Sequence, residues 1–200
     1  MGEKVKKLIL ALLLLLSCSF MVFAQTSPNY YQYRSAVEYT PTFSLSVGYG
    51  LFSLSGNFAD AGNVSNVQLQ NYGLMPNLFS LEYNKDLSDD YEMQINSSII
   101  AGQISSASGS SGINIVTLGL NLRRVWELGG RLKVHYLGAG INSNVWNNYG
   151  YGNGYEIFYG IYTEPLKYFG ILQSEIGYFS LANTDSKQAS GAYFKIGPAF

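Results

Sequence analysis

The sequence has little cysteine, charge or histidine, and each shortage removes a class of function. Cys18 is the only cysteine, which excludes a disulfide within the chain and a metal site of several thiolates. Charged residues make up 12% of the chain, about half the share usual in soluble domains. The formal net charge of −1 argues against nucleic acid as a partner. With one histidine and no phosphate-binding loop, we expect no metal and no cofactor.

Residues 1–24 have the layout of an export signal. Three lysines within residues 4–7 precede an apolar run that begins at Leu8. Small residues before Gln25 predict cleavage between Ala24 and Gln25, so that residues 25–41 form an N-terminal periplasmic segment. Two alternatives stay open: the apolar run also fits a membrane anchor, and the residues before Cys18 loosely resemble a lipoprotein cleavage box, which would make that cysteine a lipidation site.

From residue 42 onward, apolar and polar residues alternate in eight segments, and no helical period of useful length appears. In the first segment, Phe43, Leu45, Val47, Tyr49 and Leu51 alternate with serine and glycine. A period of two over segments of roughly 8–11 residues predicts β-strands, of a length that suits tilted membrane strands.

The charges of these segments all lie on the polar face, and the apolar face has none. The charged residues of the polar face are Glu82, Glu92, Arg123, Lys133, Glu156, Glu175 and Lys195. A soluble barrel would place its apolar face inside and charges outside, whereas a membrane barrel reverses the faces. The pattern therefore predicts an all-β fold, a transmembrane antiparallel up-and-down β-barrel of eight strands over residues 42–200. In lipid such a sheet must close, because an open edge would leave backbone polar groups unpaired.

The connections between the expected strands alternate in length. Residues 53–75, 103–112, 142–154 and 182–189 are rich in Gly, Asn and Ser and are predicted to be long or medium loops on the cell surface, and short periplasmic turns lie between them. Aromatic residues near the strand ends, among them Tyr162, Trp146 and Tyr149, are expected to face the two membrane interfaces.

The last strand and the cleavage site support a resemblance to a known family. Phe194, Ile196 and a terminal Phe200 alternate, and residues 137–140 read Leu-Gly-Ala-Gly. The chain resembles the small eight-stranded outer-membrane barrels of the OmpA/OmpX type, in the form common in Bacteroidetes-like bacteria. The resemblance implies that Phe194, Ile196 and Phe200 are read by the barrel-assembly machinery. Pro198 departs from the pattern because it removes a backbone donor.

The inward charges are predicted to form an ionic network that closes the barrel. Glu82, Glu92, Arg123 and Lys133 fall near the periplasmic end of four consecutive strands, with Glu92–Arg123 as the expected ion pair, because unpaired charges are costly inside a protein. The other members of the predicted interior network are His135, Glu156, Glu175 and Lys195. Some barrel hydrolases and acyltransferases use a histidine with a serine and an acid, but no motif places a serine with His135, and we expect no enzyme.

The sequence therefore predicts an exported protein of the bacterial outer membrane, with outer-membrane lipid as its surroundings. Its expected role is structural or surface interaction, with a surface or envelope protein partner bound through residues 53–75. The alternatives are an accessory subunit of an envelope secretion or motility machine, a small porin, a lipid-modifying barrel enzyme and a soluble ligand-binding barrel.

Overall fold

The computed structural model describes residues 41–72, 74–88, 90–127, 132–163 and 170–200. The described chain forms nine antiparallel strands: β1 (Phe43–Phe58), β2 (Gly62–Gln68), β3 (Leu78–Asp86), β4 (Tyr91–Ser106), β5 (Gly109–Glu127), β6 (Leu132–Trp146), β7 (Gly150–Thr163), β8 (Ile171–Asn183) and β9 (Gln188–Ala199). The predicted signal peptide, the cleavage site at Ala24 and Gln25, Cys18 and nearly all of the N-terminal segment lie outside the described residues.

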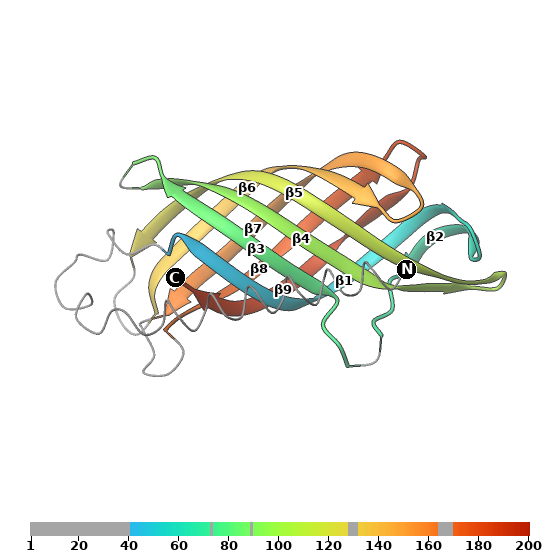
Figure 1. Cartoon of the computed structure of the whole chain (residues 1–200), viewed down its shortest axis with the longest axis horizontal. Helices are drawn as coiled ribbons and strands as arrows, with labels where there is room; N and C mark the ends of the chain where they lie inside the picture. Colours follow the sequence, from blue (N-terminus) through green and yellow to red (C-terminus); the bar gives the residue numbers. More distant parts are fainter. Residues whose placement is uncertain (1–40, 73, 89, 128–131, 164–169) are drawn as a thin grey trace, which may run out of the picture. The chain divides into compact units, whose positions relative to one another are not determined.

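The nine strands form one sheet that closes on itself. Each of β3 to β9 pairs with its neighbour in the sequence, and β9 pairs back to β1, from Ser44 opposite Ala199 to Ser55 opposite Gln188. Figure 1 shows the resulting barrel, with the β3–β4 turn and the end of β9 at one end and the β1–β2 and β4–β5 turns toward the other. The predicted closed, antiparallel, up-and-down all-β sheet is confirmed.

The described residues form nine strands where the sequence predicted eight. The additional strand, β2, lies within residues 53–75, which were predicted to be a long loop. Instead β1 continues to Phe58, and β2 runs back antiparallel to the C-terminal part of β1, with Gly62 opposite Phe58. β3 then pairs with the N-terminal part of β1 along the same edge, from Gly48 opposite Leu78 to Phe43 opposite Tyr83.

The other predicted surface loops are also mainly strand. The β4–β5 turn consists of residues 107–108, the β6–β7 turn of residues 147–149 and the β8–β9 turn of residues 184–187. Gly109 begins β5 with a φ of 146°, a value that glycine adopts without strain. The predictions of loops at 103–112, 142–154 and 182–189 were wrong, because Gly, Asn and Ser here belong to strands that continue beyond the apolar segments.

The two faces of the sheet exchange their character partway along the strands. On β1 the last apolar outward residue is Leu51, and the outward residues after it are Ser53, Ser55 and Asn57, while the inward side changes from serine and glycine to Phe52 and Leu54. On β5, Val116 faces outward below the exchange and Ile115 faces inward above it. The half of the barrel that contains Phe43 and Phe200 is called the lower half below, and the other half the upper half.

The upper half encloses an apolar core. Its largest fully buried side chains include Phe52, Leu54, Phe58, Ile100, Ile104, Ile113, Trp146, Phe179 and Leu181. Trp146 and Phe58 stack with their ring centroids 6.4 Å apart. The prediction of a polar interior is therefore correct for the lower half of the barrel and wrong for the upper half.

Candidate functional site

The outer wall of the lower half is an apolar band that runs around the barrel. Its residues that are at least half exposed include Phe43, Tyr49, Leu51, Leu118, Leu120, Leu122, Leu137, Ile141, Tyr155, Ile157 and Ile176. Lys85 and Arg124, at the lower edge, are the nearest charges on the outward face among the described strands. From Phe43 to Leu51 the band covers about 26 Å of strand, or about 20 Å in height at a tilt of about 40°.

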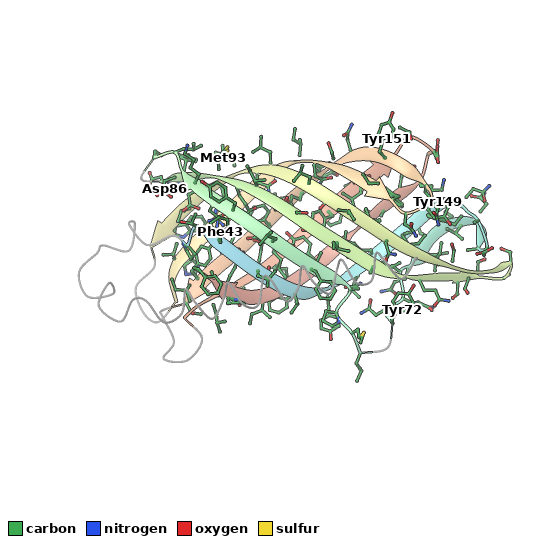
Figure 2. The ribbon with its side chains drawn as sticks, in the orientation of Figure 1. Phe43, Tyr72, Asp86, Met93, Tyr149 and Tyr151 are labelled. Carbon is green, nitrogen blue, oxygen red and sulfur yellow. The ribbon has the colours of Figure 1, made fainter. Side chains whose placement is uncertain are left out.

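Figure 2 shows how side chains cover both ends and the wall of the barrel. Phe43 and Asp86 lie at the lower end, Tyr149 and Tyr151 lie at the upper end, and Tyr72 lies on the segment between β2 and β3, which leaves the sheet. The apolar band thus lies between these two ends of the barrel, and no described outward residue within the band carries a charge.

Inside the lower half, Lys195 of β9 forms ion pairs with Glu82 of β3 and with Glu175 of β8. All three side chains are at most 1% exposed. Lys195 Nζ lies 2.8 Å from Glu175 Oε1, which also accepts the Tyr193 hydroxyl at 2.7 Å. Glu82 Oε2 accepts the Ser44 hydroxyl at 2.9 Å. Buried charges are tolerated when paired and hydrogen-bonded in this way.

Glu92 and Arg123 form a second ion pair. They face each other directly in the β4–β5 ladder, and Arg123 Nε donates to Glu92 Oε2 at 2.5 Å. The guanidinium carbon lies 4.6 Å from the centroid of the Tyr136 ring and 5.5 Å from that of Tyr162. The Tyr136 hydroxyl donates to Glu175 Oε2 at 3.0 Å, so this tyrosine joins the two ion-paired clusters.

Glu156 of β7 differs from the other buried acids because amides surround it. Its Oε1 accepts the side-chain amides of Asn96 and Asn121, both at 2.5 Å, and the side chain is 1% exposed. Among the described residues it has no ion-pair partner, and its Oε2 has no hydrogen-bond partner. Thr117 on β5 and Asn142 on β6 also have buried polar atoms without a described partner. Glu156 therefore has no direct ion pair in the described part of the chain, and it is linked to Glu82 through the amides of Asn121 and Gln94.

The predicted inward position of His135 is also wrong. His135 shares the outward face with Leu137, and the inward residue is Tyr136. Val134 is buried like Tyr136, so these apolar residues of β6 face inward and His135 between them faces outward. His135 is 8% exposed because it stacks on Trp126, 6.2 Å between ring centroids, and hydrogen-bonds Tyr159 through Nδ1. The side chain of Lys133 lies outside the described part of the chain.

Three aromatic residues that were predicted at the membrane interfaces face inward instead. Tyr162 and Trp146 are each 1% exposed and Tyr149 is 8% exposed. The Tyr149 hydroxyl hydrogen-bonds Ser111 Oγ at 2.9 Å under the upper rim. Trp146 and Tyr149 belong to the apolar core of the upper half, whereas Tyr162 lies beside Arg123 in the lower half.

The residues of the predicted assembly signal lie on the outer face. Phe194 and Ile196 are 49% and 41% exposed, and Phe200 is 43% exposed. The backbone of Phe200 exchanges two hydrogen bonds with Phe43, at 2.7 and 3.0 Å. Pro198 faces Leu172 in the β8–β9 ladder, next to the end of the strand, a place where a missing donor is tolerated.

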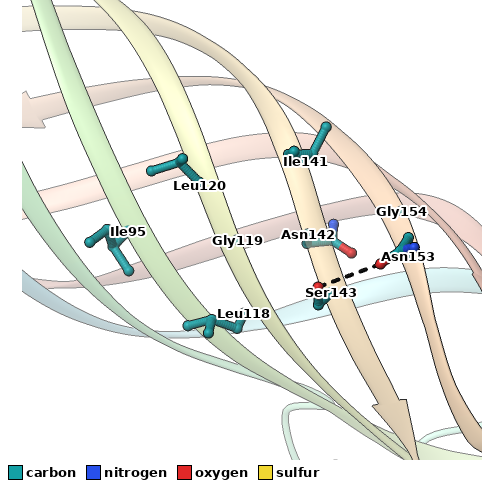
Figure 3. A pocket seen from close by; sticks show the side chains of 9 residues that line it. All are labelled: Ile95, Leu118, Gly119, Leu120, Ile141, Asn142, Ser143, Asn153 and Gly154. Carbon is teal, nitrogen blue, oxygen red and sulfur yellow. Dashed lines mark hydrogen bonds between the residues drawn. The ribbon is translucent and has the colours of Figure 1, made fainter.

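A groove of about 550 Å³ lies on the outer wall at the upper edge of the band. Figure 3 shows its apolar side chains, Ile95, Leu118, Leu120 and Ile141, with Asn153 beside Ser143. The Ser143 hydroxyl donates to Asn153 Oδ1 at 3.4 Å. The groove therefore has an apolar floor below and uncharged polar groups above, and no charged group of the described residues lines it.

The described ranges contain neither a metal-binding cluster nor a membrane-spanning helix. No group of three or more His, Cys, Asp and Glu side chains is placed to hold a metal ion. No described helix is long and apolar enough to cross a membrane.

Two solved structures resemble this chain in shape. One is the solid-state NMR structure of the outer membrane protein AlkL in DMPC lipid bilayers, with 13% identity, a TM-score of 0.49, and coverage of 88% of this chain and 97% of that one. The other is the crystal structure of Ail, the attachment invasion locus protein of Yersinia pestis, with 13% identity, a TM-score of 0.38, and coverage of 81% and 100%. No family model and no curated protein matches the chain. At this level of similarity the likeness carries no functional inference.

Proposed function

We propose that this protein is an integral β-barrel of the bacterial outer membrane, with a closed interior and a structural or surface-interaction role. The observation that carries the proposal is the uncharged apolar band on the outside of a sheet whose inside holds four glutamates, an arginine and a lysine. Monomeric soluble proteins rarely expose apolar patches of more than a few hundred Å². Lipid is the surrounding that accounts for both faces at once.

The proposal includes an orientation and a strand count. β2 and β3 pair one after the other with the same edge of β1. We therefore count them as one interrupted strand of the barrel wall, which gives eight strand positions, as in the OmpA/OmpX type. The end that carries Phe43 and Phe200 faces the periplasm, and the upper half projects from the cell surface. Export by residues 1–24 and recognition of Phe194, Ile196 and Phe200 by the barrel-assembly machinery belong to the same proposal.

A closed interior fits the side chains better than a diffusion pore does. In the upper half, Phe52, Phe58 and Trp146 are each at most 1% exposed, and in the lower half Arg123 and Lys195 are equally buried. A barrel of about eight strands has an interior that side chains can just fill. We therefore expect no steady ion conductance through this protein.

The projecting upper half is the part available to a partner. Its outward residues are mainly Ser, Asn and Gln. Asp60 and Asp185 are exposed charges at the rim, whereas Lys187 is buried and lies over the Tyr149 ring. Residues 53–75, which the sequence marked for surface interaction, form the β1–β2 hairpin and the segment after it. A surface or envelope protein that contacts this end would meet a β-hairpin with few charges.

The experiment is fractionation of the expressed protein followed by electrophoresis with and without boiling, together with conductance in planar bilayers. The proposal predicts extraction only by detergent, a faster-migrating unboiled form, and no steady conductance. Release into the soluble fraction without detergent would refute the membrane location. Stable single-channel steps from the folded form would refute the closed interior and favour a small porin.

A further inference from the structure

Between β2 and β3, beyond the bridge of Gln70 to Gln103 of β4, the chain leaves the sheet in a projecting segment that includes Tyr72, Leu74 and Met75. Both ends are fixed, because Leu69 is 3% exposed and Leu78, the first residue of β3, is fully buried. Asn77 binds the backbone of Gly50 twice: its Oδ1 accepts the Gly50 amide at 2.7 Å, and its Nδ2 donates to the Gly50 carbonyl at 2.8 Å. The segment is therefore held to β1 at a defined height.

That height is the upper edge of the apolar band. Tyr49, a half-exposed outward residue of the band, donates its hydroxyl to the Leu74 carbonyl at 2.7 Å. Tyr72 lies on the same projecting segment (Figure 2), and its hydroxyl donates to the Gly102 carbonyl of β4 at 3.1 Å. The segment thus bridges β1 and β4 just where the outward face changes from apolar to polar.

The side chains at the tip of the segment point away from the barrel. Leu74 is 95% exposed and Met75 is 70% exposed, and Leu74 is the most exposed large apolar side chain of the described residues. No charged residue lies between Asp60 and Glu82 in the sequence. A tethered, uncharged segment with two apolar side chains at its tip is suited to an apolar surrounding and poorly suited to water.

We propose that Leu74 and Met75 insert into the acyl region of the outer leaflet and fix the depth of the barrel in the membrane. The occupant of this apolar tip is lipid, because the tip continues the lipid-facing band through the Tyr49–Leu74 contact. Tyr72 and the amide of Asn77 then lie at the level of the headgroups, the region that tyrosine favours. This inference rests on the proposed membrane function.

The test is the collision of nitroxide labels with oxygen, which concentrates in lipid, and with a water-soluble nickel chelate. Labels are attached to Leu74→Cys and Met75→Cys variants in a Cys18→Ser background, refolded into phosphatidylcholine vesicles. Leu120→Cys in the band and Asn57→Cys on the upper hairpin are the reference sites, since both side chains are exposed outward. The mobility of unboiled protein in electrophoresis shows that each variant is folded.

The inference predicts that labels at positions 74 and 75 favour oxygen severalfold, as at position 120, whereas position 57 favours the chelate. If position 120 favours oxygen but positions 74 and 75 favour the chelate, the tip lies in water and the inference is overturned, which would favour a protein partner or a second copy at this site. If position 120 itself favours the chelate, the proposed membrane function fails first.

Discussion

Lys195 of β9 and Glu82 of β3, 113 residues apart in the sequence, form an ion pair inside the barrel. The two strands are not neighbours, because each pairs with one side of β1. The pair therefore crosses the inner face of β1, where Gly48 faces Lys195 in the ladder and leaves room for its side chain. One ion pair thus links both neighbours of the strand that closes the ring.

Replacing Lys195 by Met should destabilise the barrel strongly. The substitution removes the cation that Glu82 and Glu175 share and leaves two buried carboxylates without a counter-charge. Loss of one member of a buried pair costs about 3–5 kcal/mol, and urea unfolding in vesicles would measure it. Lys85→Met on the exposed end of β3 is the control and should change stability little. A stability equal to that of the unchanged protein would show that the ion pairs do not support closure.

Reversing the charge of Glu92 should disturb the β4–β5 ladder. A Glu92→Arg variant places two guanidinium groups at one level of the interior, and the double variant with Arg123→Glu restores an opposite pair. We expect the single variant to unfold at clearly lower urea and the double variant to recover part of the loss. Recovery is partial because Arg123 also lies over the Tyr136 ring. If the single change is harmless, the pair has no structural role.

An arginine in the apolar band should prevent stable insertion, whereas the same residue above the exchange of faces should not. Leu120 and Asn114 both point outward on β5, six residues apart, and only Leu120 lies in the band. A charged residue near the membrane midplane costs about 2–4 kcal/mol in such barrels. Leu120→Arg should therefore lower the free energy of unfolding by about that amount, and Asn114→Arg by much less. Equal effects at both positions would argue against a membrane boundary between them.

His135→Gln should leave the lipids of the membrane unchanged. His135 stacks on Trp126 and bonds to Tyr159, so its surroundings account for its burial without a catalytic role. The loss of stacking should lower stability by about 1 kcal/mol. Mass spectrometry of extracted lipids compares cells that carry each form. If a lipid species disappears in cells that carry the variant, the result would support the alternative that the protein is a lipid-modifying enzyme.

The sequence predicted the lower half of the barrel well and the upper half poorly. From Phe43 to Leu51 the alternation is clean and the apolar residues face outward, as expected. Beyond Leu51 the alternation continues with the faces exchanged, and the Gly, Asn and Ser residues of that region resemble loop composition. The inward Phe52, Leu54 and Phe58 were the available signal for longer strands.

Most contacts inside the barrel could not be predicted from the alternation of residues along single strands. Glu92 and Arg123 could be paired from the sequence because their opposite charges fall at the same height on neighbouring strands. The contact of Lys195 with Glu82 depends on how the ring closes, and the amide surroundings of Glu156 depend on three strands at once. His135 was misplaced because the apolar residues beside it, Val134 and Tyr136, are buried inside the barrel and do not face outward.

The most direct test of the central claim is a labelling scan along the outward face of β5 in lipid nanodiscs. Single cysteines replace Ser110, Asn114, Val116, Leu118, Leu120 and Leu122 in turn in a Cys18→Ser background, and a charged maleimide reports access from water. A band embedded in lipid predicts fast labelling at 110 and 114 and labelling at least tenfold slower from 116 to 122. Uniformly fast labelling along β5 would contradict the membrane barrel.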